Sequence, residues 1–422
     1  MKVTLLPSSI SGTIQAIASK SFAHRQLICS SLADRETEIV CSSLSDDIRA
    51  TMGCLVSLGA YADYLDGSVI VTPIASIPPE ALLDCGESGS TYRFLVPLAA
   101  ALGVRARFLL RGRLPERPMW PMWENLEGHG MSISGMGKSE VTLSGRLSGG
   151  SFILPGDVSS QFISGLLMAM PLIRGEKRIE IKDKVESAGY INMTIDVLRS
   201  FGIKVRKEGN AITMSEGEKF SSPGVTVTEG DWSNSAFWLC GAAASGQEVT
   251  CRGLNMDSSQ GDAAIAGILR DMGADVECSG SSVRVKAAGL KGIEIDAGDI
   301  PDLVPAIALA ACTAEGVTRI TNAGRLRVKE SDRLFTVADT LRKLGADIEE
   351  GEDSLSVTGG RRLAGGSVDS HGDHRIVMMA AIASLLSEDS ITIDGAGAVN
   401  KSYPGFFEDF ASLGAEVRKE QP

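Results

Sequence analysis

A five-residue pattern that recurs six times along the chain limits the possible folds more than any other feature of this sequence. The pattern consists of an apolar residue, two variable positions, an apolar or ring-bearing residue and a glycine. The glycines are Gly59, Gly130, Gly202, Gly273, Gly345 and Gly414, and successive ones are 71, 72, 71, 72 and 69 residues apart. A glycine that follows an apolar helix end is typical of a left-handed helix cap. The pattern therefore predicts six structural repeats of about 70 residues that span the chain.

A second recurrent element, a polar start that leads into an apolar helix, lies roughly forty residues before each of these glycines. The six starts are at Ser19, Ser88, Ser159, Asp231, Pro301 and Gly372. Ser, Asp and Pro–Asp are N-cap and first-turn signals, and helices that are apolar nearly all round are buried. Each start alone is an ordinary helix cap. Because Lys20, Arg25 and Arg375 also occur here, we interpret the set as anion-binding helix N-termini.

The size of the repeats determines the expected fold class. Units with several strands and two helices are too large for a solenoid of simple hairpins. We therefore expect an α/β protein with two domains of three repeats each, in which buried helices are surrounded by sheet and further helices. A chain of 422 residues fits two or three domains, and the midpoint of the repeats falls near Thr228 to Trp232.

Composition excludes several function classes. The net charge of −12 argues against a general nucleic-acid binder, although converging Lys and Arg side chains can still bind a small anion. None of the eight cysteines forms a CxxC pair, so we expect buried, reduced thiols rather than disulfides or zinc. The start of the chain lacks signal-peptide features and no apolar run is long enough to span a bilayer. We therefore expect a cytoplasmic protein without a membrane partner.

The densest cluster of charges is the segment 325–333, RLRVKESDR. If it is helical, Lys329 and Arg333 are four residues apart and share a face, with Glu330 beside them. The alternative interpretation is a solvated charged helix. Asp302, at the start of a buried helix, is either a helix cap or a proton acceptor beside a substrate hydroxyl.

Taken together, these segments resemble the 5-enolpyruvylshikimate-3-phosphate synthases, a family of enolpyruvyl transferases. The resemblance runs through the whole chain, in family order, and SSQ, RVKESDR and DHR are specific in combination. The matching segments are Ser19–Arg25, Gly86–Arg93, Arg113–Pro118, Ser159–Gln161, Ser187–Tyr190, Ile300–Asp302, Arg327–Arg333, Asp373–Arg375 and Lys401. His24 stands where Asn is common in the family, and we expect no role for it.

The resemblance implies a two-domain inside-out α/β barrel with six repeats of about 70 residues, three per domain. The chain of this family crosses twice between its domains. We therefore expect one enolpyruvyl transferase domain at residues 14–228, and a second one formed by residues 1–13 and 229–422. A cleft between the two domains would hold the substrates, and ligand binding would close it and exclude water.

The resemblance also implies two sets of substrate-binding residues. The set for phosphoenolpyruvate is Lys20, Gly89, Arg117, Gln161, Arg333, Arg375 and Lys401. The set for shikimate 3-phosphate is Lys20, Ser21, Arg25, Ser159, Ser160, Gln161, Ser187, Tyr190, Asp302 and Lys329. Arginine matches carboxylate and phosphate groups bidentately, and hydroxyl groups suit a phosphate and ring hydroxyls.

The implied reaction is an addition followed by an elimination. Asp302 takes the proton of the 5-hydroxyl of shikimate 3-phosphate as this hydroxyl attacks C2 of phosphoenolpyruvate. Glu330, alone or with Lys20, protonates the methylene carbon, and phosphate then leaves. The resemblance implies no metal and no organic cofactor, and we expect a monomer.

Two alternatives stay open at this level. The UDP-N-acetylglucosamine enolpyruvyl transferases share the fold and the donor. They carry a reactive Cys near the position of Arg117, whereas this chain has no Cys between Cys85 and Cys240. A non-catalytic anion-binding relative could keep the arginines but would not need both Asp302 and Glu330.

Overall fold

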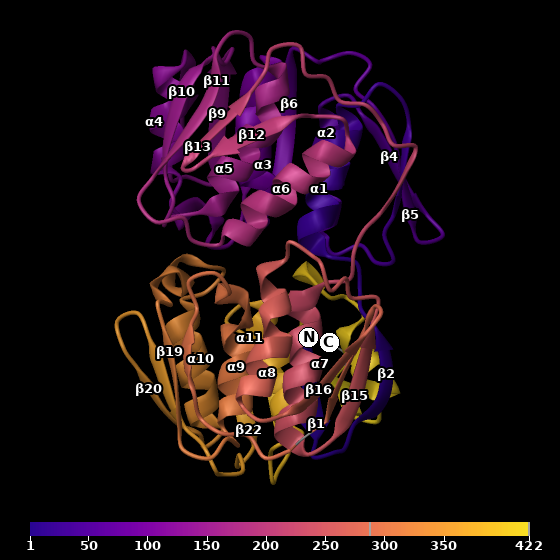
Figure 1. Cartoon of the computed structure of the whole chain (residues 1–422), viewed down its shortest axis with the longest axis vertical. Helices are drawn as coiled ribbons and strands as arrows, with labels where there is room; N and C mark the ends of the chain where they lie inside the picture. Colours follow the sequence, from indigo (N-terminus) through magenta and orange to yellow (C-terminus); the bar gives the residue numbers. More distant parts are fainter. Residues whose placement is uncertain (287, 421–422) are drawn as a thin grey trace. The chain divides into compact units, whose positions relative to one another are not determined.

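The structure, a computed structural model, describes residues 1–286 and 288–420. The chain forms two compact units. The N-terminal unit comprises Ala18–Thr228, and the C-terminal unit comprises Met1–Ile17 together with Glu229–Pro422. Figure 1 shows the first strands of the chain, in indigo, among the orange and yellow elements of the C-terminal unit.

Within the described residues, each unit contains three four-stranded sheets of one topology. In every repeat the first strand pairs parallel with the second, the second pairs antiparallel with the fourth, and the fourth pairs antiparallel with the third. In four of the repeats one helix connects the first strand to the second, whereas in the first and fourth repeats α1 follows β2 and α7 follows β14, although β2 pairs with β15 and β14 with β3. In all six repeats another helix connects the second strand to the third. The predicted α/β class and the six repeats are thereby confirmed. In the part of the chain that the structure describes, the six sheets are separate four-stranded sheets and do not join into a larger one.

The N-terminal unit holds the first three repeats. The first repeat comprises β14 (Val225–Val227), α1 (Lys20–Ser31), β3 (Thr37–Val40), α2 (Asp46–Ser57), β4 (Tyr61–Leu65) and β5 (Ser68–Thr72). The second comprises β6 (Glu80–Gly86), α3 (Gly89–Leu102), β7 (Arg105–Leu110), η1 (Leu114–Glu116), α4 (Trp120–Gly128), β8 (Met131–Ser134) and β9 (Glu140–Gly145). The third comprises β10 (Gly150–Pro155), α5 (Ser160–Ala169), η2 (Met170–Leu172), β11 (Lys177–Lys182), α6 (Ala188–Ser200), β12 (Val205–Glu208) and β13 (Ala211–Met214).

The C-terminal unit holds the other three repeats. The fourth comprises β2 (Ser11–Gln15), α7 (Trp232–Ser245), β15 (Glu248–Arg252), η3 (Gly261–Ala264), α8 (Ile265–Asp271), β16 (Asp275–Ser279) and β17 (Ser282–Lys286). The fifth comprises β18 (Glu294–Asp296), η4 (Pro301–Leu303), α9 (Val304–Ala311), β19 (Val317–Thr321), η5 (Gly324–Val328), α10 (Arg333–Lys343), β20 (Asp347–Glu350) and β21 (Leu355–Thr358). The sixth comprises β22 (Gly366–Asp369), α11 (His374–Ala383), β23 (Ile391–Asp394), η6 (Ala396–Lys401), α12 (Phe406–Ser412), β24 (Glu416–Glu420) and β1 (Lys2–Leu6).

The first helix of each repeat lies inside its unit. Helices α1, α3 and α5 contact one another in the N-terminal unit, and α7, α9 and α11 do so in the C-terminal unit (Figure 1). They are buried nearly all round, because most of their sequences are apolar or small on every face. Helix α1 is the exception, since its buried His24, Arg25 and Gln26 are polar and form hydrogen bonds with other elements. The starts of these helices therefore carry the polar residues that the sequence analysis selected.

The predicted caps are confirmed at the ends of the second helices. The six repeat glycines all adopt positive φ, from 81° at Gly202 to 115° at Gly414. At the helix starts, four side chains accept a hydrogen bond from a backbone N–H of the first turn: Ser88, Ser159, Asp231 and Asp373. In the sixth repeat the cap is therefore Asp373 rather than Gly372. In the fifth repeat the N-cap of η4 is Ile300, and Asp302 lies within this 3₁₀-helix.

Three further observations concern the whole chain. Strand β2 pairs with β15, so the first segment of the C-terminal unit extends to Ile17, beyond the residues 1–13 expected. Seven of the eight cysteines are buried and all are free thiols, but Cys278 is exposed, contrary to expectation. Among the described residues, no helix is both long enough and apolar enough to cross a bilayer.

Candidate active site

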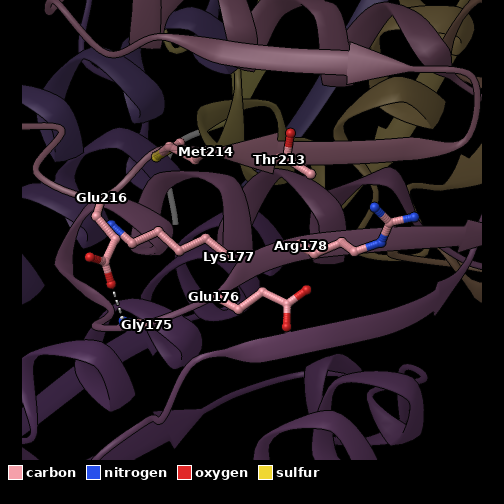
Figure 2. Close-up of a pocket in the computed structure, with 7 residues that line it drawn as sticks. All are labelled: Gly175, Glu176, Lys177, Arg178, Thr213, Met214 and Glu216. Atoms are coloured by element: carbon pink, nitrogen blue, oxygen red, sulfur yellow. Dashed lines mark hydrogen bonds between the residues drawn. The ribbon is translucent and has the colours of Figure 1, made fainter.

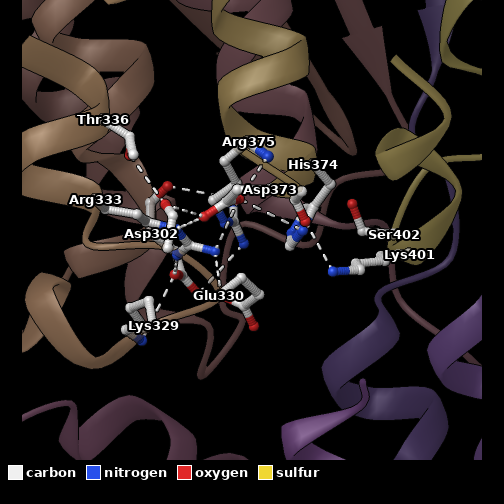
Figure 3. A network of polar contacts seen from close by, with 12 residues as sticks. Asp302, Lys329, Glu330, Arg333, Thr336, Asp373, His374, Arg375, Lys401 and Ser402 are labelled. Carbon is white, nitrogen blue, oxygen red and sulfur yellow. Dashed lines mark hydrogen bonds and ion pairs between the residues drawn. The ribbon is translucent and has the colours of Figure 1, made fainter. Parts of the chain in front are cut away.

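Arg333, the first residue of α10, is the centre of a buried ionic cluster in the C-terminal unit (Figure 3). Its guanidinium donates to Asp373 over 2.8 Å, to Asp302 over 2.7 Å and to Glu330 over 2.5 Å. Its side chain is 1% exposed. Burial alone would lower the pKa of Arg333, but the carboxylates of Asp373, Glu330 and Asp302 together raise it above the usual value. The guanidinium is therefore permanently charged and fixed in position.

Asp302 lies where three cations converge. Besides Arg333, its carboxylate lies 3.2 Å from the Arg375 guanidinium and 3.7 Å from Lys329 Nζ. Burial raises the pKa of Asp302, but Arg375, Lys329 and Arg333 outweigh burial and hold it well below its usual value. The carboxylate is therefore ionised at neutral pH and can accept a proton.

The prediction that Lys329 and Arg333 share one helix face is wrong. The 3₁₀-helix η5 ends at Val328, and α10 begins only at Arg333 after its N-cap Asp332. Asp332 accepts a hydrogen bond from the backbone N–H of Phe335, and such a cap starts a new helix. The two cations nevertheless meet, because both lie against Asp302. Burial lowers the pKa of Lys329 to about 8.

Helix α11 contributes the other predicted cation of this cluster, Arg375. Its guanidinium donates to the backbone carbonyl of Asp302 over 3.2 Å, and its backbone N–H donates to Asp373 over 3.0 Å. Lys401 Nζ donates to the carbonyl of Gly372, just before α11, over 2.8 Å. The structure thus brings together every C-terminal residue that the sequence predicted: Asp302, Lys329, Glu330, Arg333, Arg375 and Lys401 (Figure 3).

In the N-terminal unit, Gly89 begins α3 directly against Arg117. A Cβ atom added to Gly89 would lie 2.7 Å from the Arg117 guanidinium, so a larger residue would displace that side chain. Lys20 begins α1, and its ammonium group donates to the Asp47 carboxylate over 2.8 Å. These cations lie at the starts of two inner helices, where the helix dipole also favours anions.

Gln161, in the first turn of α5, connects this helix to α3. Its side-chain amide donates to Ser90 Oγ over 2.9 Å and accepts from Arg93 over 2.7 Å. Arg93 is buried and also donates to the carbonyl of Pro118, beside Arg117. Gln161 is therefore held next to the Gly89 loop by side chains from outside its own helix.

Arg25 is buried and its guanidinium donates to protein oxygens on several elements. The bonds go to Thr194 Oγ1 over 2.7 Å, to the carbonyl of Ser21 over 2.7 Å, and to Ser164 Oγ and the carbonyl of Tyr190 over 3.2 Å each. Burial lowers the pKa of Arg25 to about 10. Arg25 therefore ties the start of α1 to α5 and α6.

The remaining predicted residues lie at the starts of α5 and α6. Ser159 is the N-cap of α5 and Ser160 its first residue, and both are buried. Ser187 precedes α6 with φ of 55°, a left-handed conformation that is rare for a non-glycine residue. Tyr190 lies in the first turn of α6, and its carbonyl accepts hydrogen bonds from Arg25 and Thr194.

Four further residues of these clusters were not among the predicted site residues, and three of them hold predicted residues in place. Asp47 binds Lys20, Arg93 binds Gln161, and Asp373 binds Arg333. The fourth is Asp262, which accepts from Ser233 Oγ. Burial and the nearby charge of Asp302 raise its pKa to about 7. Asp373 was detectable as a helix cap and Arg93 as the last residue of the matching segment Gly86–Arg93, but no sequence pattern marked Asp47 or Asp262.

A shallow hollow of about 340 Å³ lies elsewhere in the N-terminal unit (Figure 2). Its lining comes from β11, β13 and the segments beside them: Gly175, Glu176, Lys177, Arg178, Thr213, Met214 and Glu216. None of the predicted site residues lines it, so it is separate from the clusters described above.

The chemistry of the two clusters is that of a site for highly charged anions. Cations are fixed by buried carboxylates, and inner helix N-termini lie among them. An ionised carboxylate, Asp302, and a second carboxylate, Glu330, lie within the same cluster and can move protons.

Comparisons with known proteins agree along the whole chain. The family model described as EPSP synthase (3-phosphoshikimate 1-carboxyvinyltransferase) matches residues 6–410. A 3-phosphoshikimate 1-carboxyvinyltransferase of Clostridium kluyveri is 40% identical over 417 residues, which cover 98% of each chain. One of Halobacterium salinarum is 39% identical and covers 99% of this chain and 100% of its own. A solved EPSP synthase of Acinetobacter baumannii has a TM-score of 0.82 and 28% identity, with coverage of 99% and 100%.

The fold and the site thus define a transferase built from six α/β repeats. More particularly, the chain belongs to the EPSP synthase family. It is an enzyme that transfers the enolpyruvyl group of phosphoenolpyruvate to shikimate 3-phosphate, a step of the shikimate pathway of aromatic amino-acid biosynthesis. The resemblance predicted from the motifs is confirmed, and the comparisons favour this reaction over the two alternatives.

Proposed function

We propose that the residues predicted from the motifs bind the two substrates and carry out the proton transfers of this reaction. The main support for this proposal is the cluster in which Arg333 contacts both Asp302 and Glu330. Lys329 and Arg375 also lie against Asp302. A protein that only bound anions could hold Arg333 with a wholly buried carboxylate such as Asp373, whereas Asp302 and Glu330 each keep 16% of their side-chain surface exposed and can therefore also reach a ligand.

Phosphoenolpyruvate carries a carboxylate and a phosphate, and we assign its binding to residues of both units. In this proposal the ligands are Lys20, Gly89, Arg117, Gln161, Arg333, Arg375 and Lys401. The contact between Gly89 and the Arg117 guanidinium supports the assignment, since it places an arginine directly beside the N-terminus of α3, and both favour an anion.

Shikimate 3-phosphate carries a phosphate and ring hydroxyls. In this proposal its ligands are Lys20, Ser21, Arg25, Ser159, Ser160, Gln161, Ser187, Tyr190, Asp302 and Lys329. The grouping of Ser159, Ser160 and Gln161 at the start of α5 supports it, because hydroxyl and amide groups beside a helix N-terminus suit a phosphate. Arg25 already donates to four protein oxygens, so its contribution would come largely from its charge.

The first chemical step forms the bond between the 5-hydroxyl oxygen of shikimate 3-phosphate and C2 of phosphoenolpyruvate. Asp302 accepts the hydroxyl proton in this step. In the unliganded protein the cations around Asp302 make it a weak base. Substrate anions that bind Arg333 and Arg375 would compete with Asp302 for these cations, and its pKa would rise as the substrates bind.

A proton is added to the methylene carbon as C2 is attacked, and Glu330 or Lys20 supplies it. This gives a tetrahedral intermediate with a methyl group. Loss of one methyl proton and departure of phosphate then restore the double bond. The fixed cations stabilise the charge on the leaving phosphate.

An assay of phosphate release with both substrates tests these roles. We expect Asp302→Ala and Glu330→Gln to lower kcat by roughly a hundredfold to ten-thousandfold, the range for loss of a general acid or base. The matched control is Asp347→Ala, an exposed carboxylate on β20 outside both clusters, which should turn over like the wild type. Undiminished turnover of both site variants would refute the assigned roles, whereas no phosphate release by the wild type would refute the reaction itself.

We also propose that the enzyme acts as a monomer in the cytoplasm. Two units that each contain three complete sheets support a self-sufficient chain. Size-exclusion chromatography with light scattering tests the monomer, and a mass of twice that of the chain would contradict it.

A further inference from the structure

A chain of buried hydrogen bonds crosses the three helices α1, α2 and α3 in the N-terminal unit. His24 Nδ1 on α1 lies 2.7 Å from Thr51 Oγ1 on α2, and Thr51 Oγ1 lies 2.7 Å from Thr91 Oγ1 on α3. Thr91 Oγ1 in turn donates to Ser88 Oγ over 2.7 Å. The side chains of His24, Thr51 and Thr91 are fully buried. No role in binding or catalysis has been assigned above to any of these four residues.

The direction in which these hydrogen bonds are donated follows from the number of hydroxyl protons available. Thr91 has one hydroxyl proton, which it donates to Ser88 Oγ or, more weakly, to the carbonyl of Asp47 over 3.4 Å. Thr91 must therefore accept from Thr51, and Thr51 must accept from His24. The imidazole consequently carries its proton on Nδ1.

The surroundings of the imidazole agree with this tautomer. His24 Nε2 is buried and has no hydrogen-bond partner among the described residues. An N–H at that position would be left without an acceptor, which costs more than a bare ring nitrogen against an apolar wall. Burial, with the charges of Lys20 and Arg25, keeps the pKa of His24 well below its usual value, so the ring is neutral.

The end of this hydrogen-bond series at Thr91 and Ser88 lies beside proposed substrate ligands. Ser88 is the N-cap of α3 and immediately precedes Gly89, which lies against Arg117. The carbonyl of Asp47 is next to the chain, and its carboxylate holds Lys20. The hydrogen bonds thus connect the start of α3 to the side chain that places the Lys20 ammonium group.

We propose that His24 and Thr91 are positioning residues for phosphoenolpyruvate. Through Thr51 and Ser88 they fix the first turn of α3, and through Asp47 they fix Lys20. Neither residue touches the substrate in this proposal. The inference rests on the proposed function, because it assumes that Gly89 and Lys20 bind phosphoenolpyruvate.

Steady-state kinetics of isosteric variants tests the proposal. Thr91→Val removes the hydroxyl and keeps the shape, and we expect the KM for phosphoenolpyruvate to rise roughly twofold to tenfold, the range for loss of one buried hydrogen bond. The KM for shikimate 3-phosphate should rise less. The matched control is Thr318→Val on β19 of the C-terminal unit, since Thr318 is equally buried and its Oγ1 has no partner among the described residues. If Thr91→Val behaves like Thr318→Val in both KM values, the proposal fails.

Substitution of His24 separates positioning from simple packing. The side-chain amide nitrogen of His24→Asn can occupy nearly the same place as Nδ1 and donate to Thr51, whereas His24→Leu cannot. We expect His24→Asn to keep the KM for phosphoenolpyruvate within about twofold of the wild type and His24→Leu to raise it as Thr91→Val does. Equal effects of the two variants would contradict the proposal.

The tautomer provides a readout that needs no substrate. Nitrogen-15 NMR of the free enzyme should show His24 as a neutral imidazole protonated at Nδ1, and this signal should change in Thr91→Val. A proton on Nε2 would overturn the inferred direction of the chain. Because this measurement is independent of turnover, its failure is distinct from failure of the proposed function.

Discussion

At the scale of single residues, largely buried carboxylates and cations of the C-terminal unit contact one another. Removing a charge from water is costly unless it is paired, and Arg333 meets this cost with three carboxylates. Of these, Asp373 is wholly buried, whereas Asp302 and Glu330 retain 16% of their side-chain surface. Asp373 therefore anchors the arginine, whereas the other two carboxylates are exposed enough for the proton transfers proposed for them.

The lowered pKa of Lys329 predicts a pH dependence of substrate binding. Its pKa of about 8 means that the ammonium group loses its proton as the pH rises through this value. If the charged form binds shikimate 3-phosphate, kcat/KM for this substrate should fall above about pH 8, by up to tenfold per pH unit for one essential proton. Lys329→Arg should move this fall to higher pH, because guanidinium stays charged.

The matched control for this pH profile is Lys343→Arg. Lys343 is an exposed lysine on α10 that pairs with Asp339, and its substitution should leave the profile unchanged. A profile of Lys329→Arg that coincides with that of the wild type would show that another group titrates.

At the scale of elements, each repeat uses a glycine to end its second helix, and four repeats use a polar side chain to cap the start of the first. The glycine is required by backbone conformation, because φ above 80° is strained for any residue with a Cβ atom. The polar start is required because the first N–H groups of a buried helix need acceptors. Since substrate anions can serve as such acceptors, the same local physics creates both the fold and its binding capacity.

Two glycines at helix α2 give a direct test of this conformational requirement. Gly59, just beyond the helix, has φ of 103°, and an added Cβ would lie 2.5 Å from the carbonyl oxygen of Ser76. Gly53, inside the helix, has ordinary helical geometry and nothing within 4 Å of an added Cβ. We expect Gly59→Ala to lower the free energy of unfolding by at least roughly 1–2 kcal/mol, and Gly53→Ala to raise it by about 0.5–1 kcal/mol.

Urea denaturation of the two variants beside the wild type measures this difference. Because both substitutions add one methyl group near the same helix, each serves as the control for the other. Equal free energies of unfolding would show that the helix end does not depend on glycine.

At the scale of the whole molecule, the order of the strands along the sequence differs from their order within the sheets. Strand β1 lies between β23 and β24 and pairs with both, so the first residues complete the sheet formed by the last ones. Strand β14, near the end of the N-terminal unit, supplies the parallel strand next to β3, near its beginning. Each unit is therefore completed by a segment that is distant in sequence.

This topology predicts how fragments of the chain behave. A fragment of residues 18–228 contains all strands of its three sheets and should unfold cooperatively on its own. A fragment that begins at residue 229 lacks β1, an inner strand with hydrogen bonds on both sides, and should be unfolded or aggregate.

Circular dichroism of the two fragments checks this expectation. Adding a peptide of residues 1–17 to the second fragment should restore part of its structure, because that peptide carries β1 and β2. A stable second fragment without the peptide would contradict the prediction.

The sequence by itself determined the six repeats, the helix ends, the buried helix starts and the family. These features depend on local patterns, since a left-handed glycine, an N-cap or an apolar helix is recognisable within a few residues. It also indicated most residues of the site, because they belong to short segments that resemble a known family. It failed at Lys329, where a cap at Asp332 interrupts the expected helix.

Only the tertiary structure decided which of these residues meet. Arg333 contacts Asp302 and Asp373, which are 31 and 40 residues away in sequence, and Lys20 contacts Asp47, which is 27 residues away. Such pairs depend on how separate helices pack, within one repeat for Asp302 and Asp47 and between two repeats for Asp373, which no local pattern specifies. The same holds for the raised pKa of Asp262 and for the hydrogen bonds of His24. Burial and neighbours determine both properties, and these arise only when the chain is folded.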